Sequence, residues 1–200
     1  MRLTSVLLLS WAFVPQLIAQ NPLDQILDER NRSRQIEEIL EDRMENLLHE
    51  LMKREGSDMW ILISREYNED PVMKTMLPST WLSARRRTIM VFFQGEESFQ
   101  KVAIARYSVG RLLKGEWNVN VYPNQWEALV KIIEDKQPKK IGLNFSKYFA
   151  LADGLVKTEY DEFIEKLPEG YHSRVVSDEK LAIAWLETGS VKEKALYPMI

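Results

Sequence analysis

Residues 57–93 decide the fold, with the sequence SDMWILISREYNEDPVMKTMLPSTWLSARRRTIMVFF. Two apolar runs, 59–63 and 88–93, bracket a loop dense in charged and turn-forming residues. Short runs that are apolar throughout are typical of strands covered on both faces, and the pattern alone also allows a buried helix segment. A polar loop between two buried strands is where a small α/β domain usually keeps its specific contacts.

The rest of the chain alternates between helical and extended patterns. Apolar residues at three- and four-residue steps predict a helix over 33–55, ended by Gly56 in a left-handed conformation. Apolar or alternating runs predict further strands at 101–107, 117–121, 140–145 and 173–176, with the first joined to 88–93 as an antiparallel hairpin. Further helices are expected at 125–136, 158–167 and 178–186. The pattern therefore predicts an α/β domain around a mixed β-sheet of about five or six strands, flanked by helices.

Composition and the N-terminal segment narrow the class of protein. The chain has 200 residues, a net charge of −3 and no cysteine. This acidic balance argues against a general affinity for nucleic acid, and disulfides and thiolate chemistry are excluded. Residues 1–20 have a positive start, a short apolar core and a small residue before Gln20, the layout of a secretory signal peptide. We therefore expect an exported protein, periplasmic or secreted, without stable membrane insertion, because no later segment is long and apolar enough to span.

The C-terminal segment predicts an unfinished element. Ser190 and Glu193 form a capping-box pattern, and apolar residues continue the helical period to Ile200 without a stop signal. Two explanations remain open: a C-terminal helix that docks back on the domain, or the beginning of a longer protein. We favour the second, with residues 21–189 as the domain and 190–200 as the start of a connector helix.

The candidate chemistry is concentrated in the loop of 57–93. Glu66, Glu69 and Asp70 are close enough in sequence to act as paired carboxylates or to bind a divalent cation, and the competing interpretation pairs them with nearby arginines or places Asp70 in a turn. The run 85–87 of three arginines can grip a carboxylate or satisfy local acids. Trp81 can face a pocket or anchor the core. The two histidines, His49 and His172, lack a partner at helical spacing for a metal site.

Four segments carry a resemblance to a known family: 58–60, 65–71, 84–88 and 149–154, followed by 184–188. Together they resemble the N-terminal domain of exported bacterial aminopeptidase P-like proteins, in the creatinase/prolidase/Xaa-Pro aminopeptidase superfamily. The resemblance covers about 23–200 and is most specific in the loop and at 152–154.

This resemblance implies an α/β N-terminal domain followed by a pita-bread catalytic domain. There, two divalent metal ions such as manganese, cobalt or zinc activate water to cleave the bond before proline. None of the metal-ligand motifs is present in this chain, so no catalytic or metal-binding residue is carried over. The N-terminal domain of such enzymes mediates subunit contacts and walls the active site. On loop position, the candidates for that wall or interface are Arg65, Glu66, Tyr67, Asp70, Trp81 and Arg86.

The expected partners follow from the same resemblance: the chain's own catalytic domain, further copies in a homo-oligomer, and proline-containing peptides in the full-length protein. Two alternatives remain. The chain is a stand-alone binding or assembly module of the same fold, or it is an independent hydrolase that uses Glu66, Glu69 and Asp70.

Overall fold

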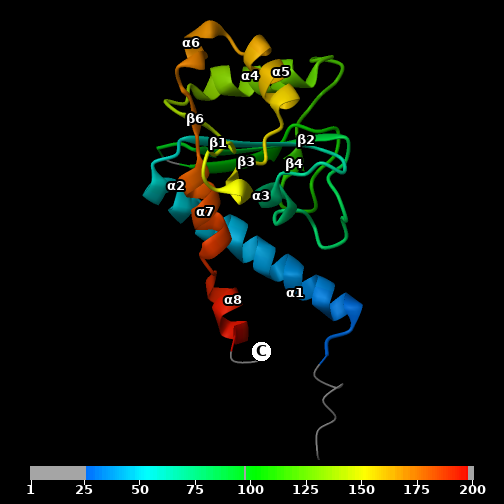
Figure 1. The fold of residues 1–200 in the computed structure, drawn as a ribbon. Coiled ribbons are helices and arrows are strands. Elements are labelled where there is room, and N and C mark those ends of the chain that lie inside the picture. The colour runs from blue at the N-terminus through cyan, green and yellow to red at the C-terminus, as the bar shows by residue number, and fades with distance from the viewer. Residues whose placement is uncertain (1–25, 97, 198–200) are drawn as a thin grey trace, which may run out of the picture.

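A computed structural model describes residues 26–96 and 98–197 (Figure 1). The expected signal peptide at 1–20 lies outside the described residues, as do the last three residues of the expected connector. A mixed six-stranded sheet lies between two layers of helices, which confirms the expected α/β class and sheet size.

One long helical rod leads into the sheet. It consists of α1 (Glu29–Asp42), the π-helical segment η2 (Arg43–Leu47) and α2 (Leu48–Glu55). Asp28 caps its start by accepting a hydrogen bond from the backbone N–H of Asn31 at 2.7 Å. Gly56 ends it at a φ of 67°, which confirms the predicted left-handed cap. The apolar stripe in the sequence therefore marks a helix four residues longer at its start than predicted.

The sheet has the strand order β4-β3-β2-β1-β5-β6. Its strands are β1 (Met59–Arg65), β2 (Arg87–Gln94), β3 (Phe99–Ala103), β4 (Lys114–Gly115), β5 (Ile141–Leu143) and β6 (Val175–Ser177). β2 is antiparallel to both of its neighbours, β1 and β3, whereas β1, β5 and β6 run parallel to one another. The two apolar runs that bracket the loop are thus paired neighbours in the sheet.

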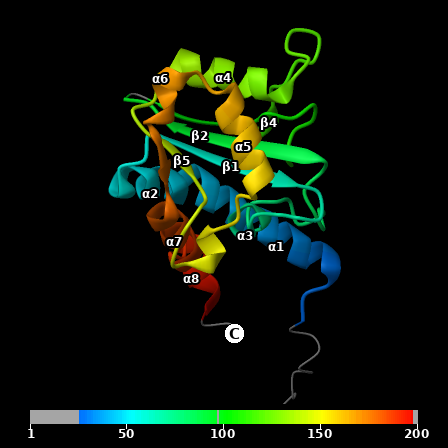
Figure 2. The same cartoon turned by 45° about the horizontal axis from the view of Figure 1, so that its top comes forward.

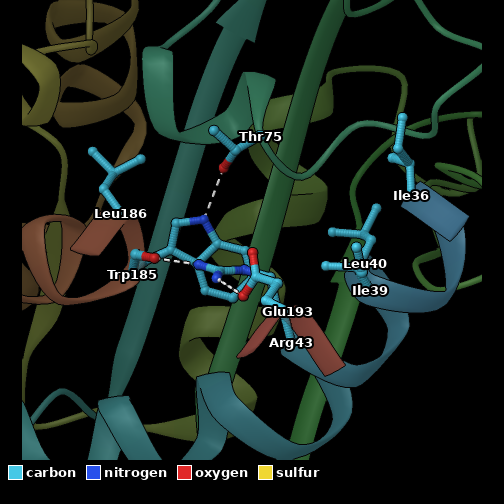
Figure 3. A pocket seen from close by; sticks show the side chains of 8 residues that line it. All are labelled: Ile36, Ile39, Leu40, Arg43, Thr75, Trp185, Leu186 and Glu193. Carbon is cyan, nitrogen blue, oxygen red and sulfur yellow. Dashed lines mark hydrogen bonds and ion pairs between the residues drawn. The ribbon is translucent and has the colours of Figure 1, made fainter. Parts of the chain in front are cut away.

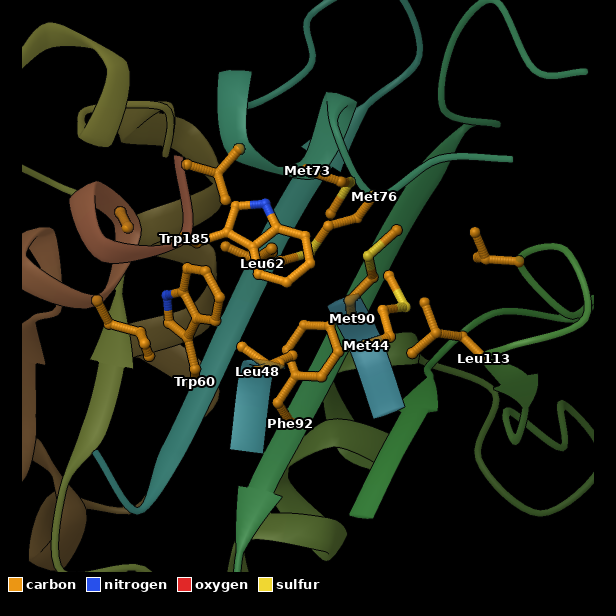
Figure 4. Close-up of a cluster of buried hydrophobic side chains, with 14 of the residues drawn as sticks. Met44, Leu48, Trp60, Leu62, Met73, Met76, Met90, Phe92, Leu113 and Trp185 are labelled. Carbon is orange, nitrogen blue, oxygen red and sulfur yellow. The ribbon is translucent and has the colours of Figure 1, made fainter. Parts of the chain in front are cut away.

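Alternate residues of β1 and β2 supply two separate cores. Trp60, Leu62 and Phe92 face the side covered by the helical rod, and Figure 4 shows them among Met44, Leu48 and Trp185. Ile61 and Val91 point to the opposite side. A strand buried on both faces is apolar at every position, so this two-sided burial explains the continuous apolar runs.

The helices divide between the two faces of the sheet. α4 (Gln125–Lys136), α5 (Lys157–Lys166) and α6 (Glu169–His172) lie on one side, and Figure 2 shows α4 and α5 over the strands. The rod, α3 (Pro71–Lys74), the 3₁₀ turn η3 (Ala150–Ala152) and α7 (Glu179–Glu187) cover the other side. α8 (Val191–Leu196) leads away from the sheet beside α1, as Figure 1 shows.

Two strand predictions need correction. The expected strand at 117–121 is wrong, because Asn118 forms a turn: its side chain accepts the N–H of Asn120 at 3.0 Å and its carbonyl accepts the N–H of Tyr122 at 2.9 Å. Asparagine side chains favour such turns, and alternation with valine imitated a strand. The strand at 101–107 begins and ends earlier, as β3, and its hairpin with β2 is confirmed.

Gly142 in β5 provides a test of how tightly the sheet packs against α7. A Cβ atom on Gly142 would lie 1.8 Å from Oδ2 of Asp178. Gly142→Ala is therefore expected to lower the free energy of unfolding by about 1–3 kcal/mol in urea titrations, through overpacking. Gly170→Ala in α6 is the matched control, because nothing lies within 4 Å of its Cβ position. A neutral Gly142→Ala would contradict the close contact.

Candidate functional site

The loop residues lie at one edge of the sheet. Arg65 at the end of β1 pairs with Arg87 at the start of β2, so the whole segment 66–86 leaves and re-enters at this edge. β1 and β5 are parallel, so the segment that follows β5 begins at the same edge. Sheet topology thus brings together the two segments, 65–71 and 149–154, that the sequence separates by about 80 residues. We call this region the strand-end edge.

Asp70 is the buried anchor of the loop. Its side chain caps α3, accepting the backbone N–H groups of Val72 at 2.8 Å and Met73 at 3.0 Å. Asn144 donates to both carboxylate oxygens, at 3.2 and 3.0 Å, and accepts the indole N–H of Trp60 at 2.8 Å. Every one of these contacts is buried, so Asp70 positions the loop and offers no free carboxylate at the surface.

The segment 149–154 packs directly on this anchor. A Cβ atom on Gly154 would lie 2.2 Å from Oδ2 of Asp70 and 2.8 Å from its Cα atom. Only glycine allows this approach without displacing Asp70. Asp153 also holds this segment to the residues that follow β5, because its side chain accepts the backbone N–H of Ser146 at 3.1 Å.

The other two acids of the loop also bind backbone groups. Glu69 accepts the N–H groups of Tyr67 and Ala84, each at 2.9 Å, and Glu66 accepts the N–H of Arg86 at 3.1 Å. The competing interpretation is wrong for Glu66 and Glu69, which bind backbone amides in place of arginine side chains. It is right for Asp70, which caps α3 directly before Pro71. The three carboxylates face different donors and do not form a paired acid–base site.

Two residues of the loop keep an unusual backbone conformation. Tyr67 has a φ of 65° and Arg86 a φ of 51°, in the left-handed region that is costly for residues with a Cβ atom. Tyr67 is 84% exposed, so its ring packs little against the residues that the structure describes, although Glu69 accepts its backbone N–H. Backbone strain at an exposed aromatic residue supports the hypothesis that Tyr67 contacts another domain or molecule.

Burial raises the pKa of Asp70 above its usual range, although hydrogen bonds from Met73, Asn144 and Val72 oppose the shift. A raised folded-state pKa gives a contribution to stability that is complete below about pH 4 and is lost as the pH rises through the folded-state value. Asp70→Asn cannot ionise. Its free energy of unfolding is therefore expected to improve relative to wild type as the pH rises from about 4.

Urea unfolding of both proteins across a pH series measures this difference. Asp178→Asn should change in the same direction, because burial also raises the pKa of Asp178. The prediction would be contradicted if the free energy of unfolding of the wild type increased relative to that of Asp70→Asn as the pH rises.

Arg65 and Arg87 bind acids of α5 that the sequence did not single out. Glu159 is fully buried, with its two carboxylate oxygens 2.9 Å from Nε of Arg65 and 2.6 Å from Nε of Arg87. Glu162 lies 2.6 Å from Nη2 of Arg87 and accepts the indole N–H of Trp126 at 3.0 Å. This indole hydrogen bond and the Arg87 charge lower the pKa of Glu162.

Trp81 lies half-buried at the same edge and fits neither sequence interpretation fully. The guanidinium of Arg85 stacks 4.4 Å above its ring, and the Tyr107 ring meets it edge-on at 5.9 Å. The Tyr107 hydroxyl donates to the carbonyl oxygen of Arg85. Trp81 thus joins the loop to the segment after β3 and remains partly accessible.

A hollow lies between α1, α7 and α8. It has a volume of about 240 Å³, and Figure 3 shows Arg43 at its centre beside Trp185 and Glu193. Arg43 donates to the carbonyl oxygens of Thr188, at 2.9 Å, and Trp185, while its guanidinium lies 4.2 Å from the Trp185 ring. The carboxylate of Glu193 lies 2.6 Å from Nη1 of Arg43, so this arginine ties α8 to the rod.

The predicted capping box at the start of α8 is confirmed. Ser190 accepts the N–H of Glu193 at 3.3 Å, and Glu193 accepts the N–H of Ser190 at 2.6 Å. No residue of α8 is buried, and Val191 is 81% exposed. α8 is therefore held through its first turn, without a packed apolar face.

The described residues do not bring together a donor set for a metal ion. No group of three or more His, Asp and Glu side chains forms a candidate site in 26–96 and 98–197. His49 bonds the Gln94 side chain and His172 the carbonyl oxygen of Leu167. The two divalent ions that the family resemblance implies thus have no fitting ligands in this part of the chain. Within the same residues, no helix has the length and apolar character needed to cross a bilayer.

No protein-family model, curated protein or solved structure matches the chain.

Proposed function

We propose that this chain is the non-catalytic N-terminal domain of an exported, proline-directed metallopeptidase of the Xaa-Pro aminopeptidase type. Its strand-end edge serves subunit contacts and walls the active site of a catalytic domain that carries the two metal ions. The proposed partners are that catalytic domain, further copies of the chain and proline-containing peptides.

One observation carries the proposal. Three of the segments that carry the resemblance, 65–71, 84–88 and 149–154, meet at the strand-end edge. Glu66 and Glu69 bind the backbone of Arg86 and Ala84, and Gly154 packs on Asp70. These three segments are far apart in sequence and form one region of the fold. We expect such a common region if the resemblance reflects a contact surface and not only similar core packing.

The first test is the coding DNA beyond Ile200. An in-frame continuation that supplies two Asp, one His and two Glu at metal-ligand spacing supports the proposal. A stop codon immediately after Ile200 contradicts it and leaves the stand-alone module.

The stand-alone module is favoured by one observation of its own: each face of the sheet carries a buried hydrophobic core formed by described residues. A domain with its own cores is expected to fold by itself. The independent hydrolase is tested by incubating the chain with a proline dipeptide and manganese. Turnover that disappears in Glu69→Gln would overturn the non-catalytic assignment.

A substitution at Tyr67 distinguishes a role in contacts with other domains or subunits from a role in stabilising this fold. Tyr67→Gly removes the left-handed strain, so the free energy of unfolding should stay equal or rise by up to about 1 kcal/mol. The same change should weaken self-association, measured by sedimentation, and raise KM in the protein that includes the catalytic domain. Gln137→Gly is the matched control, because Gln137 also has a positive φ, of 48°, but lies at the end of α4. Unchanged association and KM in Tyr67→Gly would contradict the contact role.

A further inference from the structure

A hollow with a volume of about 440 Å³ lies beside the strand-end edge and shares Arg86 with it. Arg86 and Arg87 reach it from the start of β2, Arg106 and Tyr107 from the end of β3, and Trp117 from the segment after β4. Three arginines and two aromatic rings thus line one depression, although they come from three places in the sequence.

The charges in this hollow are only partly neutralised. Arg87 is engaged by Glu159 and Glu162 of α5. The guanidinium groups of Arg86 and Arg106 form no ion pair with any residue in the described ranges. Glu66 binds the backbone N–H of Arg86 and not its guanidinium. Two exposed cations therefore remain available for an anion.

Gln125 lines the hollow, and hydrogen bonds within the chain hold its side chain in place. Gln125, the first residue of α4, is buried, and its side-chain amide donates to the carbonyl oxygens of Ile104 and Arg87. This amide joins α4 to β2 and to the end of β3. The N-terminus of a twelve-residue helix at the floor adds a further favourable potential for an anion.

The walls identify the kind of anion. The aromatic residues Tyr107 and Trp117 line the hollow, and the guanidinium of Arg106 lies 5.1 Å from the Trp117 ring. Phosphate sites usually collect several backbone N–H donors in a glycine-rich loop, and the lining residues include no glycine. Arginine binds carboxylates through two parallel hydrogen bonds, and an apolar wall suits an attached apolar group.

We propose that this hollow binds an organic carboxylate that carries an apolar or aromatic group, such as a free aromatic acid or the C-terminal residue of a peptide. Arg86 and Arg106 hold the carboxylate, and Tyr107 and Trp117 contact the apolar group. The inference stands on the hollow alone and does not require the proposed peptidase partner.

Titration of the ¹⁵N-labelled full chain by NMR tests the site. N-acetylphenylalanine should shift the indole N–H signal of Trp117 with a Kd of about 1 mM, the affinity expected for a ligand of this size. Phenylacetate is the second probe: tighter binding of N-acetylphenylalanine assigns a peptide end, and tighter binding of phenylacetate assigns a free acid. N-acetylphenylalaninamide lacks the carboxylate and should leave the signal unchanged.

Two variants distinguish specific binding in the hollow from a general effect of positive charge on the protein surface. Arg106→Gln should raise the Kd at least about fivefold, by removing a charged hydrogen-bond donor. Arg111→Gln loses the same charge at a residue that pairs with Glu41 outside the hollow, and should leave the Kd unchanged. Equal weakening by both variants, binding of the amide, or phosphate binding at the same affinity would each overturn the carboxylate assignment. So would the absence of any saturable shift in a chain with a native spectrum.

Discussion

Replacing Trp185 by alanine is expected to lower the free energy of unfolding by about 3–5 kcal/mol. Trp185 is fully buried, and it is one of the largest side chains in the core between the sheet and the helical rod. Its indole N–H donates to Oγ1 of Thr75 at 2.8 Å, so it also joins α7 to the end of α3. Truncation therefore removes apolar contacts, leaves a cavity and leaves a hydroxyl without this partner. Urea unfolding followed by circular dichroism measures the loss.

A second effect distinguishes Trp185 from other core residues. The ring supports the Arg43 guanidinium, which in turn holds Glu193 and the first turn of α8. Trp185→Ala is expected to release α8, so that trypsin cleaves after Lys192 or Lys194 several times faster under native conditions. Proteolysis at low protease concentration, with mass detection of the fragments, follows this change.

Trp126 provides the matched control. It is equally buried, but it lies in the core on the opposite face of the sheet. Trp126→Ala should lose a similar amount of stability and leave the native cleavage rate in α8 unchanged. Equal acceleration in both variants would show that α8 responds to global stability, and would contradict the role given to Arg43 and Trp185.

The elements with strong periodicity were predictable from the sequence. The stripe from Ile36 to Met52, the apolar runs of β1 and β2 and the capping box at Ser190 each express a repeat or a local hydrogen-bond pattern. Such signals depend on residues a few positions apart, and the chain satisfies them locally. The coarse fold class follows from these elements.

The features that depend on tertiary contact were not predictable. β4 has only two residues, and its pairing with β3 defines it. The π-helical turn begins at Arg43, whose side chain meets the carbonyl oxygen of Thr188 and the carboxylate of Glu193 more than 140 positions away in sequence. Glu159 had one local signal, since it lies four residues before the buried Phe163 and shares its helix face. A carboxylate on a buried helix face requires a cation, and the arginines at 65 and 87 supply it from distant positions.

The second large effect is expected at that carboxylate. Glu159→Gln should lower the free energy of unfolding by about 3 kcal/mol, the lower end of the range for removing one partner of a buried ion pair. The lower end applies because Arg65 is 48% exposed and regains water, whereas the Arg87 side chain is 24% exposed. Glutamine has nearly the same shape, so chemical denaturation measures the loss of charge rather than the loss of volume.

Glu162→Gln is the control for a carboxylate on the same helix. Its side chain is 49% exposed, and it shares Arg87 with Glu159. A half-exposed pair contributes at most about 1 kcal/mol, so this variant should change stability much less. If both variants lose the same amount, the difference in burial does not control the energy of the cluster.

The contact between Arg87 and Glu159 predicts which interaction supplies most of this stabilisation. The 2.6 Å contact between Arg87 Nε and Glu159 Oε2 joins two full charges, and Nη2 of Arg87 also donates to Oε1 of Glu159 at 3.4 Å. Glu159→Gln combined with Arg87→Gln removes both charges, and a double-mutant cycle should therefore recover a large part of the loss. The two single losses would simply add if directional hydrogen bonds to other partners dominated. Arg87 also borders the carboxylate hollow, and in Glu159→Gln it keeps Glu162 as its one remaining acid. Loss of the Glu159 charge should therefore tighten N-acetylphenylalanine binding, which links stability at α5 to affinity at the hollow.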